Sequence, residues 1–346
     1  MNYAVEIIYK DSQSNSNRAA EVTADLIPGQ GRHPWWPARR RRPTRWPTSA
    51  SRTAPCVTND TPWQPPHFFG RGGDPKKGFE WTYHFFWGLE DIIGVYANLW
   101  EQIPTGKTVG ALWPNDSDGN AWGDAKMGFP PVLQKKGFKL VDQGRYQSPS
   151  DNFSTYLNAF KKNGVDITGV VPPPDFANFW SQAGQQGFRP KIVTVAKASE
   201  FPAAIEAFGD RAAGLSVEVW WSPSHPFRSS LTGQSSAQLA ADRHEGQRAP
   251  MDHAAGLQAR LFEVAEDASG ARRGQNPAAI RDAIRQTNLP TMVGPVNFKT
   301  GPVPNVSKTP LVGGQWRRRG KNLELVIVEN SQAPMVPVQD KLVPIA

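Results

Sequence analysis

The feature that most constrains the fold is a regular alternation of apolar, strand-type runs with helical patterns between residues 79 and 221. An aromatic segment at 81–87 leads into a helical pattern at 88–102, in which apolar residues recur every three or four positions. Strands follow at 109–113, 138–142, 167–171, 192–195 and 215–221, and helices at 121–136 (broken at Pro130 and Pro131), 153–163, 176–186 and 202–208. Strands and helices that alternate at this spacing form βαβ units, so we predict an α/β fold with parallel sheets.

The polar loop 114–123 directly follows the strand at 109–113. In open α/β sheets, ligands bind outside the carboxyl ends of the strands. We therefore expect a binding site at this loop and at the loops PPPD, AKASEFP and SPSHPF that follow later strands.

The pattern is weaker outside this region. A strand at 5–9 and a helix at 18–27 precede the run 28–54, which has no periodicity and is expected to be irregular. A short strand at 55–58 follows that run. In the last third we expect helices at 235–241, 258–268 and 277–286 and strands at 295–298, 314–317 and 323–329.

Charge and composition exclude several classes of protein. Of the basic residues behind the net charge of +8, seven arginines fall between residues 28 and 55 without any acid. A basic patch confined to one Pro- and Trp-rich run does not resemble a nucleic-acid-binding face, so no nucleic-acid partner is expected. The single Cys56 excludes an internal disulfide and a cysteine-based metal site. No apolar run is long enough for a membrane span, and the start of the sequence lacks a signal-peptide pattern.

No motif for catalysis, a cofactor or a metal stands out. GxGxxG is missing, and TGKT at 105–108 lacks the first glycine of a phosphate loop and precedes a strand. Ser222, Ser224 and His225 lie close together in the sequence but are more simply read as a polar loop. Asp116 and Asp118 have no histidine at ligand spacing. We predict no enzyme activity, no cofactor and no metal site.

Tryptophans gather at the predicted strand ends. Flat apolar rings with a few polar groups are typical of small-molecule sites, although core packing is the default for any single tryptophan. Including neighbouring polar residues, the candidate ligand contacts are Asp60, Thr61, Trp63, Trp87, Trp113, Asn115, Asp116, Trp122, Pro173, Lys197, Trp220 and Trp221.

Several segments together resemble the branched-chain amino-acid-type solute-binding proteins of ABC importers. They are YKDSQSNSNRAAEVTADLI, PCVTNDTPW, FEWTYHFFWGLED, ALWPNDSDGNAWGD, PPPDFANFWSQAGQQGFRPKIVT, WWSPSHPFRSSLTGQS and VGPVNF…TPLVGGQW. The resemblance covers most of 1–27 and 55–245 and much of 290–330, and it is specific in order and spacing.

The resemblance implies the type I periplasmic binding protein fold: two Rossmann-like α/β lobes with parallel sheets, joined by a three-segment hinge, with the solute enclosed between them. Lobe 1 is expected to hold 1–86 and about 225–290, and lobe 2 to hold 87–222 and about 291–346. The implied protein is a periplasmic or otherwise extracytoplasmic monomer that captures a small amino-acid-like or carboxylate solute for an ABC permease. A ligand-sensing receptor domain of the same fold, without transport, is the alternative.

Two departures from the family lie in the first lobe and at 251–259. The family has a signal peptide and roughly one more strand–helix unit before the position of Met1, so we expect an incomplete first lobe. RRPTRW stands at 41–46 where the family has a TPDT-like motif, and bases that encode it can also be read, two positions later, as TPDTVA. We therefore hypothesise that frameshifts alter the stretches 28–54 and 251–259, which resequencing would test. We expect weak or absent solute binding by this chain.

Lys197 gives the sharpest expectation about the solute. In the amino-acid binders of the family, an acidic residue after the strand equivalent to 192–195 holds the ligand's ammonium group. A cation at this place would repel an ammonium and attract a carboxylate. We expect a small carboxylate-bearing solute, aromatic or apolar, unless a structural pair between Lys197 and Glu200 neutralises the lysine.

Overall fold

The computed structural model describes residues 10, 11, 18, 21, 22, 36–38, 56–59, 61–170, 175–200, 202–247, 254–270, 277–320 and 322–345. The chain divides into two compact units. Unit 1 comprises Met1–Phe86, Leu261–Leu289 and Val296–Lys308, and unit 2 comprises Trp87–Arg260, Pro290–Pro295 and Thr309–Ala346. Both are α/β, as the alternation of strands and helices predicted.

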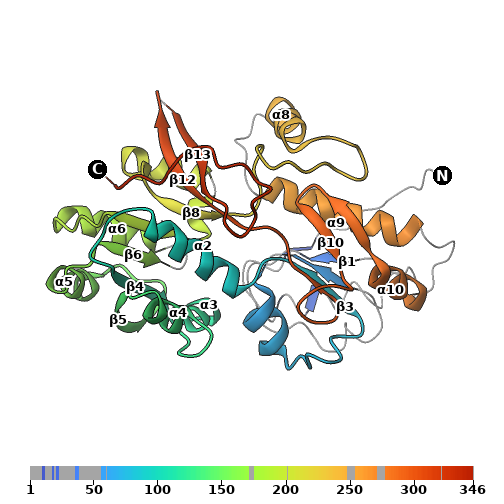
Figure 1. The fold of residues 1–346 in the computed structure, drawn as a ribbon, viewed down its shortest axis with the longest axis horizontal. Helices are drawn as coiled ribbons and strands as arrows, with labels where there is room; N and C mark the ends of the chain where they lie inside the picture. Colours follow the sequence, from blue (N-terminus) through green and yellow to red (C-terminus); the bar gives the residue numbers. More distant parts are fainter. Residues whose placement is uncertain are drawn as a thin grey trace. The chain divides into compact units, whose positions relative to one another are not determined.

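Unit 2 is built on a seven-stranded sheet with the order β13-β12-β8-β7-β6-β4-β5 (Figure 1). Strands β4 to β8 run parallel, whereas β12 pairs antiparallel with both β8 and β13. The strands are β4 (Thr108–Pro114), β5 (Lys139–Tyr146), β6 (Ile167–Val170), β7 (Ile192–Val195), β8 (Ser216–Val219), β12 (Val312–Arg319) and β13 (Asn322–Glu329). The predicted parallel sheet is confirmed.

Helices cover both faces of this sheet. Leu112 of β4 and Val193 of β7 pack in a cluster with the helices on one face. On the other face the Trp100 ring packs next to Gly169, where an added Cβ would lie at an ordinary contact distance of 3.4 Å. The helices of unit 2 are α2 (Leu89–Glu101), α3 (Ser117–Trp122), α4 (Phe129–Lys135), α5 (Ser154–Lys162), α6 (Phe176–Gln185), α7 (Pro202–Phe208) and α8 (Ser236–Gln247), with short 3-10 turns η4 (Ala198–Glu200) and η5 (Gly209–Ala212).

Two expectations for residues 114–136 are wrong. The polar loop 114–123 contains a short helix, α3, because the Asp116 carboxylate caps it by accepting the N–H groups of Asp118 at 3.0 Å and Gly119 at 2.8 Å. The two prolines, 130 and 131, lie in the first turn of α4 rather than breaking a longer helix. Proline is tolerated there because the first-turn N–H groups have no partner within the helix.

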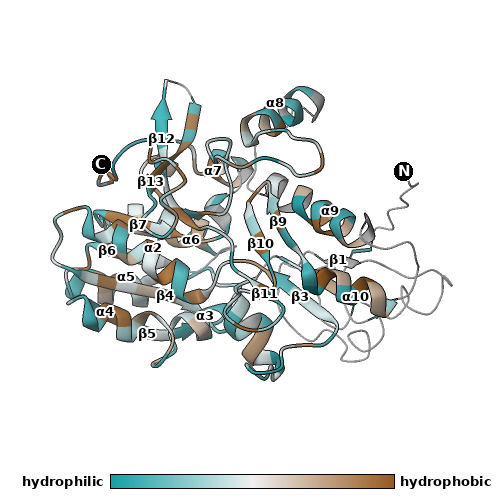
Figure 2. Ribbon diagram, turned by 45° about the vertical axis from the view of Figure 1, so that its right-hand side comes forward, coloured by the Kyte–Doolittle hydropathy of each residue, from teal (hydrophilic) through white to brown (hydrophobic). Residues whose placement is uncertain are grey.

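Unit 1 holds a four-stranded sheet with the order β1-β2-β3-β11, and its paired strands run parallel. A two-stranded sheet, β9-β10, includes residues of both units. The elements are β1 (Trp36–Ala38), β2 (Cys56–Thr58), η2 (Trp63–Phe68), η3 (Phe69–Arg71), β3 (Thr82–Phe85), α10 (Pro277–Gln286), β9 (Asn288–Thr291), β10 (Gly294–Asn297) and β11 (Val306–Ser307). Helix α9 (Ala254–Gly270) begins in unit 2, and its residues from Leu261 onward belong to unit 1. Along α9 and α10, hydrophobic and hydrophilic residues alternate, as expected for helices that cover a sheet with one face (Figure 2).

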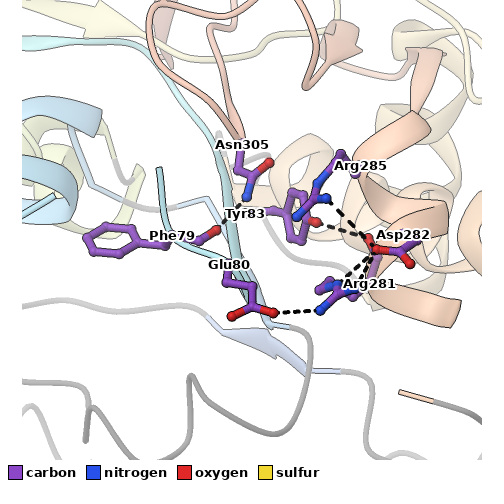
Figure 3. Close-up of polar contacts among 7 residues, drawn as sticks. All are labelled: Phe79, Glu80, Tyr83, Arg281, Asp282, Arg285 and Asn305. Carbon is purple, nitrogen blue, oxygen red and sulfur yellow. Dashed lines mark hydrogen bonds and ion pairs between the residues drawn. The ribbon is translucent and has the colours of Figure 1, made fainter. Parts of the chain in front are cut away.

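Polar contacts tie β3 to α10 at the edge of this core (Figure 3). Glu80, just before β3, forms an ion pair with Arg281 of α10 at 2.7 Å. The Tyr83 hydroxyl donates to the Arg281 carbonyl oxygen at 2.9 Å, while its ring packs against Phe298. The helix is therefore fixed to the strand by apolar and polar contacts together.

Four expectations concern unit 1. The run 28–54 was expected to be irregular throughout, but it contains β1, because backbone pairing with β2 needs no side-chain periodicity. The segment that returns to unit 1 is Leu261–Leu289, with Val296–Lys308, rather than 225–290. Helix α8 belongs to unit 2 because Ala240 packs with Trp221 and Met292. The predicted strand 5–9 lies outside the described residues, and residues 18, 21 and 22 of the predicted helix 18–27 are helical.

Candidate functional site

In unit 2 the most charged group of side chains lies at the carboxyl ends of the parallel strands. Asp118 of α3, which follows β4, forms an ion pair with Lys197, which follows β7. Since β6 lies between β4 and β7, this pair spans the end of the strand between them. The side chains are 11% exposed for Asp118 and 26% for Lys197, so both are largely buried.

The loop after β7 has an unusual backbone that places this lysine. Lys197 has φ of 56°, in the left-handed region that non-glycine residues adopt infrequently. The Trp316 indole N–H donates to the Ser199 carbonyl at 2.6 Å, and the Ser199 hydroxyl donates to the Val195 carbonyl. These contacts hold the turn in a conformation that costs energy, a type of strain that is often found at functional sites.

Burial and neighbouring charges act on these groups in opposite directions. Burial alone would lower the pKa of the Lys197 ammonium, but the Asp118 carboxylate and then Glu218 and Asp116 outweigh it, so the pKa is raised. Burial also raises the pKa of the Asp116 carboxyl group. Lys197 therefore stays cationic in a setting rich in carboxyl groups.

Behind Lys197 lies a buried carboxyl pair that sequence reasoning did not assign to the site. Glu200 ends η4 and Glu218 lies in β8, and neither side chain is exposed. The Tyr96 hydroxyl of α2 donates to a Glu218 oxygen. Burial, and then Glu218, raises the pKa of Glu200 well above its usual value, while burial raises that of Glu218. The structural pair that was considered between Lys197 and Glu200 is thus replaced by one between Lys197 and Asp118.

The candidate tryptophans of unit 2 are all buried, with exposed fractions between 0 and 8%. Trp122 packs edge-on against Tyr96 at 5.8 Å and lies 5.0 Å from Phe129. Trp113 lies 4.9 Å from the Arg145 guanidinium. Trp87 and Trp220 lie 6.1 Å apart, and the Trp221 indole N–H donates to Ser236 at 3.1 Å. These rings are buried near the strand ends, and their contact with a solute stays a prediction. Asn115 is exposed beside Asp116.

The strand ends of unit 1 carry threonine and histidine side chains. Thr58 ends β2, and its hydroxyl lies 2.7 Å from Nδ1 of His84, whose Nε2 lies 2.8 Å from the Thr61 carbonyl oxygen. The His67 ring stacks on the His84 ring at 4.0 Å. Burial, and then His84 and Arg71, lowers the pKa of His67 well below its usual value. Sequence reasoning missed both histidines, because no spacing signal links them to the strand end.

The remaining candidates of unit 1 and the β6 loop are placed as follows. Trp63 is buried and lies 5.9 Å from Phe69 in a cluster with Val303 and Val306. Thr61 is also buried, next to His84. Asp60 and Pro173 lie outside the described residues.

The serine–histidine group after β8 does not form a catalytic triad. Ser222 Oγ lies 2.9 Å from His225 Nδ1, which also accepts the Ser222 backbone N–H at 3.0 Å. Burial lowers the pKa of His225 to about 4. In the part of the chain that the structure describes, no carboxylate orients this ring, since His225 Nε2 has no partner. The same residues contain no group of three or more His, Cys, Asp or Glu side chains that could hold a metal ion.

Comparison with known proteins defines the family. A model of the periplasmic binding protein family matches residues 1–305. The chain belongs to this family, which comprises solute-binding proteins. A search of curated sequences finds no significant match. Among the helices that the structure describes, none has the length and apolarity needed to cross a membrane.

Solved structures show the same fold at low sequence identity. A leucine-binding protein from Thermotoga maritima has a TM-score of 0.69 at 16% identity, covering 93% of this chain and 87% of that one. A branched-chain amino acid binding protein from Streptococcus pneumoniae, in complex with isoleucine, has a TM-score of 0.66 at 14% identity, covering 94% and 87%. A solute-binding protein from R. palustris, in complex with 4-hydroxybenzoate, has a TM-score of 0.68 at 14% identity, covering 93% and 84%. The fold is therefore that of the type I periplasmic binding proteins.

Proposed function

We propose that this chain is the extracytoplasmic component of an ABC importer and captures a small solute that carries a carboxylate group. The solute is amino-acid-like or aromatic, the protein works as a monomer, and its membrane partner is an ABC permease. Family membership supports this role. The solutes bound by two structural relatives, isoleucine and 4-hydroxybenzoate, differ in shape but share a carboxylate.

Lys197 is the observation that carries the choice of solute. Its ammonium group has three N–H donors, and among the described residues Asp118 is its one hydrogen-bond partner. The side chain is 26% exposed at the carboxyl edge of the sheet. A solute carboxylate can therefore accept a hydrogen bond from a second N–H of the Lys197 ammonium group without displacing Asp118. We also expect Trp113 and Trp122, which are buried in the same unit, to contribute apolar contacts to the solute.

A panel of solutes tests this proposal. Benzoate, 4-hydroxybenzoate, isoleucine and the neutral benzamide are compared by ligand-observed NMR, which detects weak binding. We expect the carboxylates to bind and benzamide to bind at least about tenfold more weakly, the change that one pKa unit of interaction energy gives. Lys197→Met keeps the apolar stem and should remove the preference.

The matched control is Lys136→Met. Lys136 is 29% exposed and forms an ion pair with Glu101 at 2.6 Å, so it resembles Lys197 in exposure and pairing. Its removal should leave solute binding unchanged. Equal binding of benzoate and benzamide by the unaltered chain, or equal loss in both variants, contradicts the assignment of Lys197.

A further inference from the structure

The carboxyl groups of Glu200 and Glu218 form a buried pair in unit 2. Both side chains are fully buried, one in η4 and the other in β8. The two residues lie in elements that pack against each other, η4 and β8. The Tyr96 hydroxyl supplies a donor to one Glu218 oxygen, whereas neither Glu200 oxygen has a donor among the described residues. With both groups ionised, Glu200 would be a buried charge without a hydrogen bond.

A single proton shared by the two carboxyl groups would remove this buried, unpaired charge. Two adjacent carboxylates in a low-dielectric interior cannot both ionise, so one keeps its proton and donates it to the other. Burial, and then Glu218, raises the pKa of Glu200, which is the shift that a retained proton requires. Burial also raises the pKa of Tyr96 well above its usual value, so the phenol remains a donor.

We propose that Glu200 and Glu218 share one proton, and that this proton sets the charge that Lys197 presents to a solute carboxylate. The proposal rests on the proposed function in its second part only. Loss of the proton adds a negative charge to the carboxyl pair. This charge then competes with the solute carboxylate for the Lys197 ammonium group. The charged or titratable groups around the pair are Tyr96 on α2, Lys197 after β7, and Asp116 and Asp118 at the start of α3.

The carboxyl group of Glu200 is not needed to shape the loop that carries Lys197. The backbone N–H of Glu200 donates to the Lys197 carbonyl at 3.3 Å, and the Ser199 carbonyl accepts from Trp316. These bonds use the backbone of the loop and would persist with glutamine at position 200. A role in positioning charge is therefore separable from a role in folding.

Infrared spectroscopy of the unliganded protein tests the shared proton. At neutral pH we expect the carbonyl band of a protonated carboxylic acid, lost in both Glu200→Gln and Glu218→Gln. In each variant the amide group donates the hydrogen bond that the proton supplied. Glu329→Gln is the control, because Glu329 is also buried but accepts a hydrogen bond from the Ser331 backbone N–H at 2.8 Å. Lack of the band, or its survival in both variants of the pair, overturns the proposal.

The pH dependence of benzoate binding tests the link to Lys197. As pH rises through the titration of the pair, affinity should fall by about tenfold, the change that one pKa unit of interaction gives. By linkage, proton and carboxylate favour each other's binding equally. In Glu200→Gln the profile should be flat, and an unchanged profile there contradicts the link. If benzoate binds at no pH, the proposed solute class and the link to Lys197 both fail, while the infrared band still decides the question of the proton.

Discussion

The carboxyl ends of the strands carry very different polar groups in the two units. In unit 1, the Thr58 hydroxyl lies 2.7 Å from Nδ1 of His84, and burial holds the pKa of His67 well below its usual value. In unit 2, Asp118 and Lys197 form an ion pair, and the buried carboxyl pair of Glu200 and Glu218 lies in the same unit. The difference teaches that one α/β architecture can carry threonine and histidine groups at the strand ends of one unit and an ion pair at those of the other.

Reversing the charge of Lys197 should give the largest effect. Lys197→Glu leaves Asp118 unpaired beside the carboxyl pair, and breaking a largely buried ion pair costs about 3 kcal/mol of unfolding free energy. Lys136→Glu, at a more exposed pair, should cost under about 1 kcal/mol. Urea unfolding followed by tryptophan fluorescence measures both, and equal losses would remove the distinction between a functional and a surface pair.

Acidification should distinguish His225 from Glu200, because the two residues change the free energy of unfolding in opposite directions as pH falls. His225 is neutral when folded and has a pKa of about 4, so the unfolded chain binds protons first as pH falls below about 6.5. Stability should therefore fall by roughly 3 kcal/mol between these values, and His225→Gln should abolish that loss.

Burial raises the pKa of Glu200, so its effect on the pH dependence of stability is opposite to that of His225. The folded state keeps a proton that the unfolded state releases above about 4.5, so stability falls as pH rises through this range. Glu200→Gln should flatten that fall. Unfolding curves across pH measure both slopes, and slopes of the same sign in the two variants contradict the assignment.

Removing the Thr58–His84 contact in unit 1 should have an intermediate effect. His84→Ala leaves the Thr58 hydroxyl and the Thr61 carbonyl buried without this partner, at a cost of about 2 kcal/mol. Benzoate binding should keep its preference over benzamide, because Lys197 and Asp118 are unchanged in this variant. Loss of that preference in His84→Ala would show that His84 also selects the solute.

The smallest effect is expected at Asp116. Asp116→Ala removes the cap of α3 and should cost about 1 kcal/mol, whereas Asp116→Asn keeps a capping oxygen and should be nearly neutral. Thermal unfolding measures the pair of variants. A large loss in Asp116→Asn would mean that the charge, rather than the cap, is what this residue contributes.

Much of unit 2 could be predicted from the sequence, because periodicity is a local signal. The bounds of β7 and α7 were predicted to the residue. Helix α3 was missed because six residues carry too little periodicity, and its signal is the cap at Asp116. The partner of Lys197 was sought at Glu200, three positions away, but Asp118 lies 79 positions away. The pairing of Thr58 with His84 was missed for the same reason, since only the order of strands brings them together.

The most direct test of the central claim is the ratio of benzoate to benzamide affinity in the unaltered chain and in Lys197→Met, measured side by side by NMR titration. The account predicts that the unaltered chain binds benzoate at least about tenfold more tightly than benzamide, and that the ratio falls to about one in Lys197→Met. A ratio near one in the unaltered chain, or a preference for benzoate that survives in Lys197→Met, would contradict it.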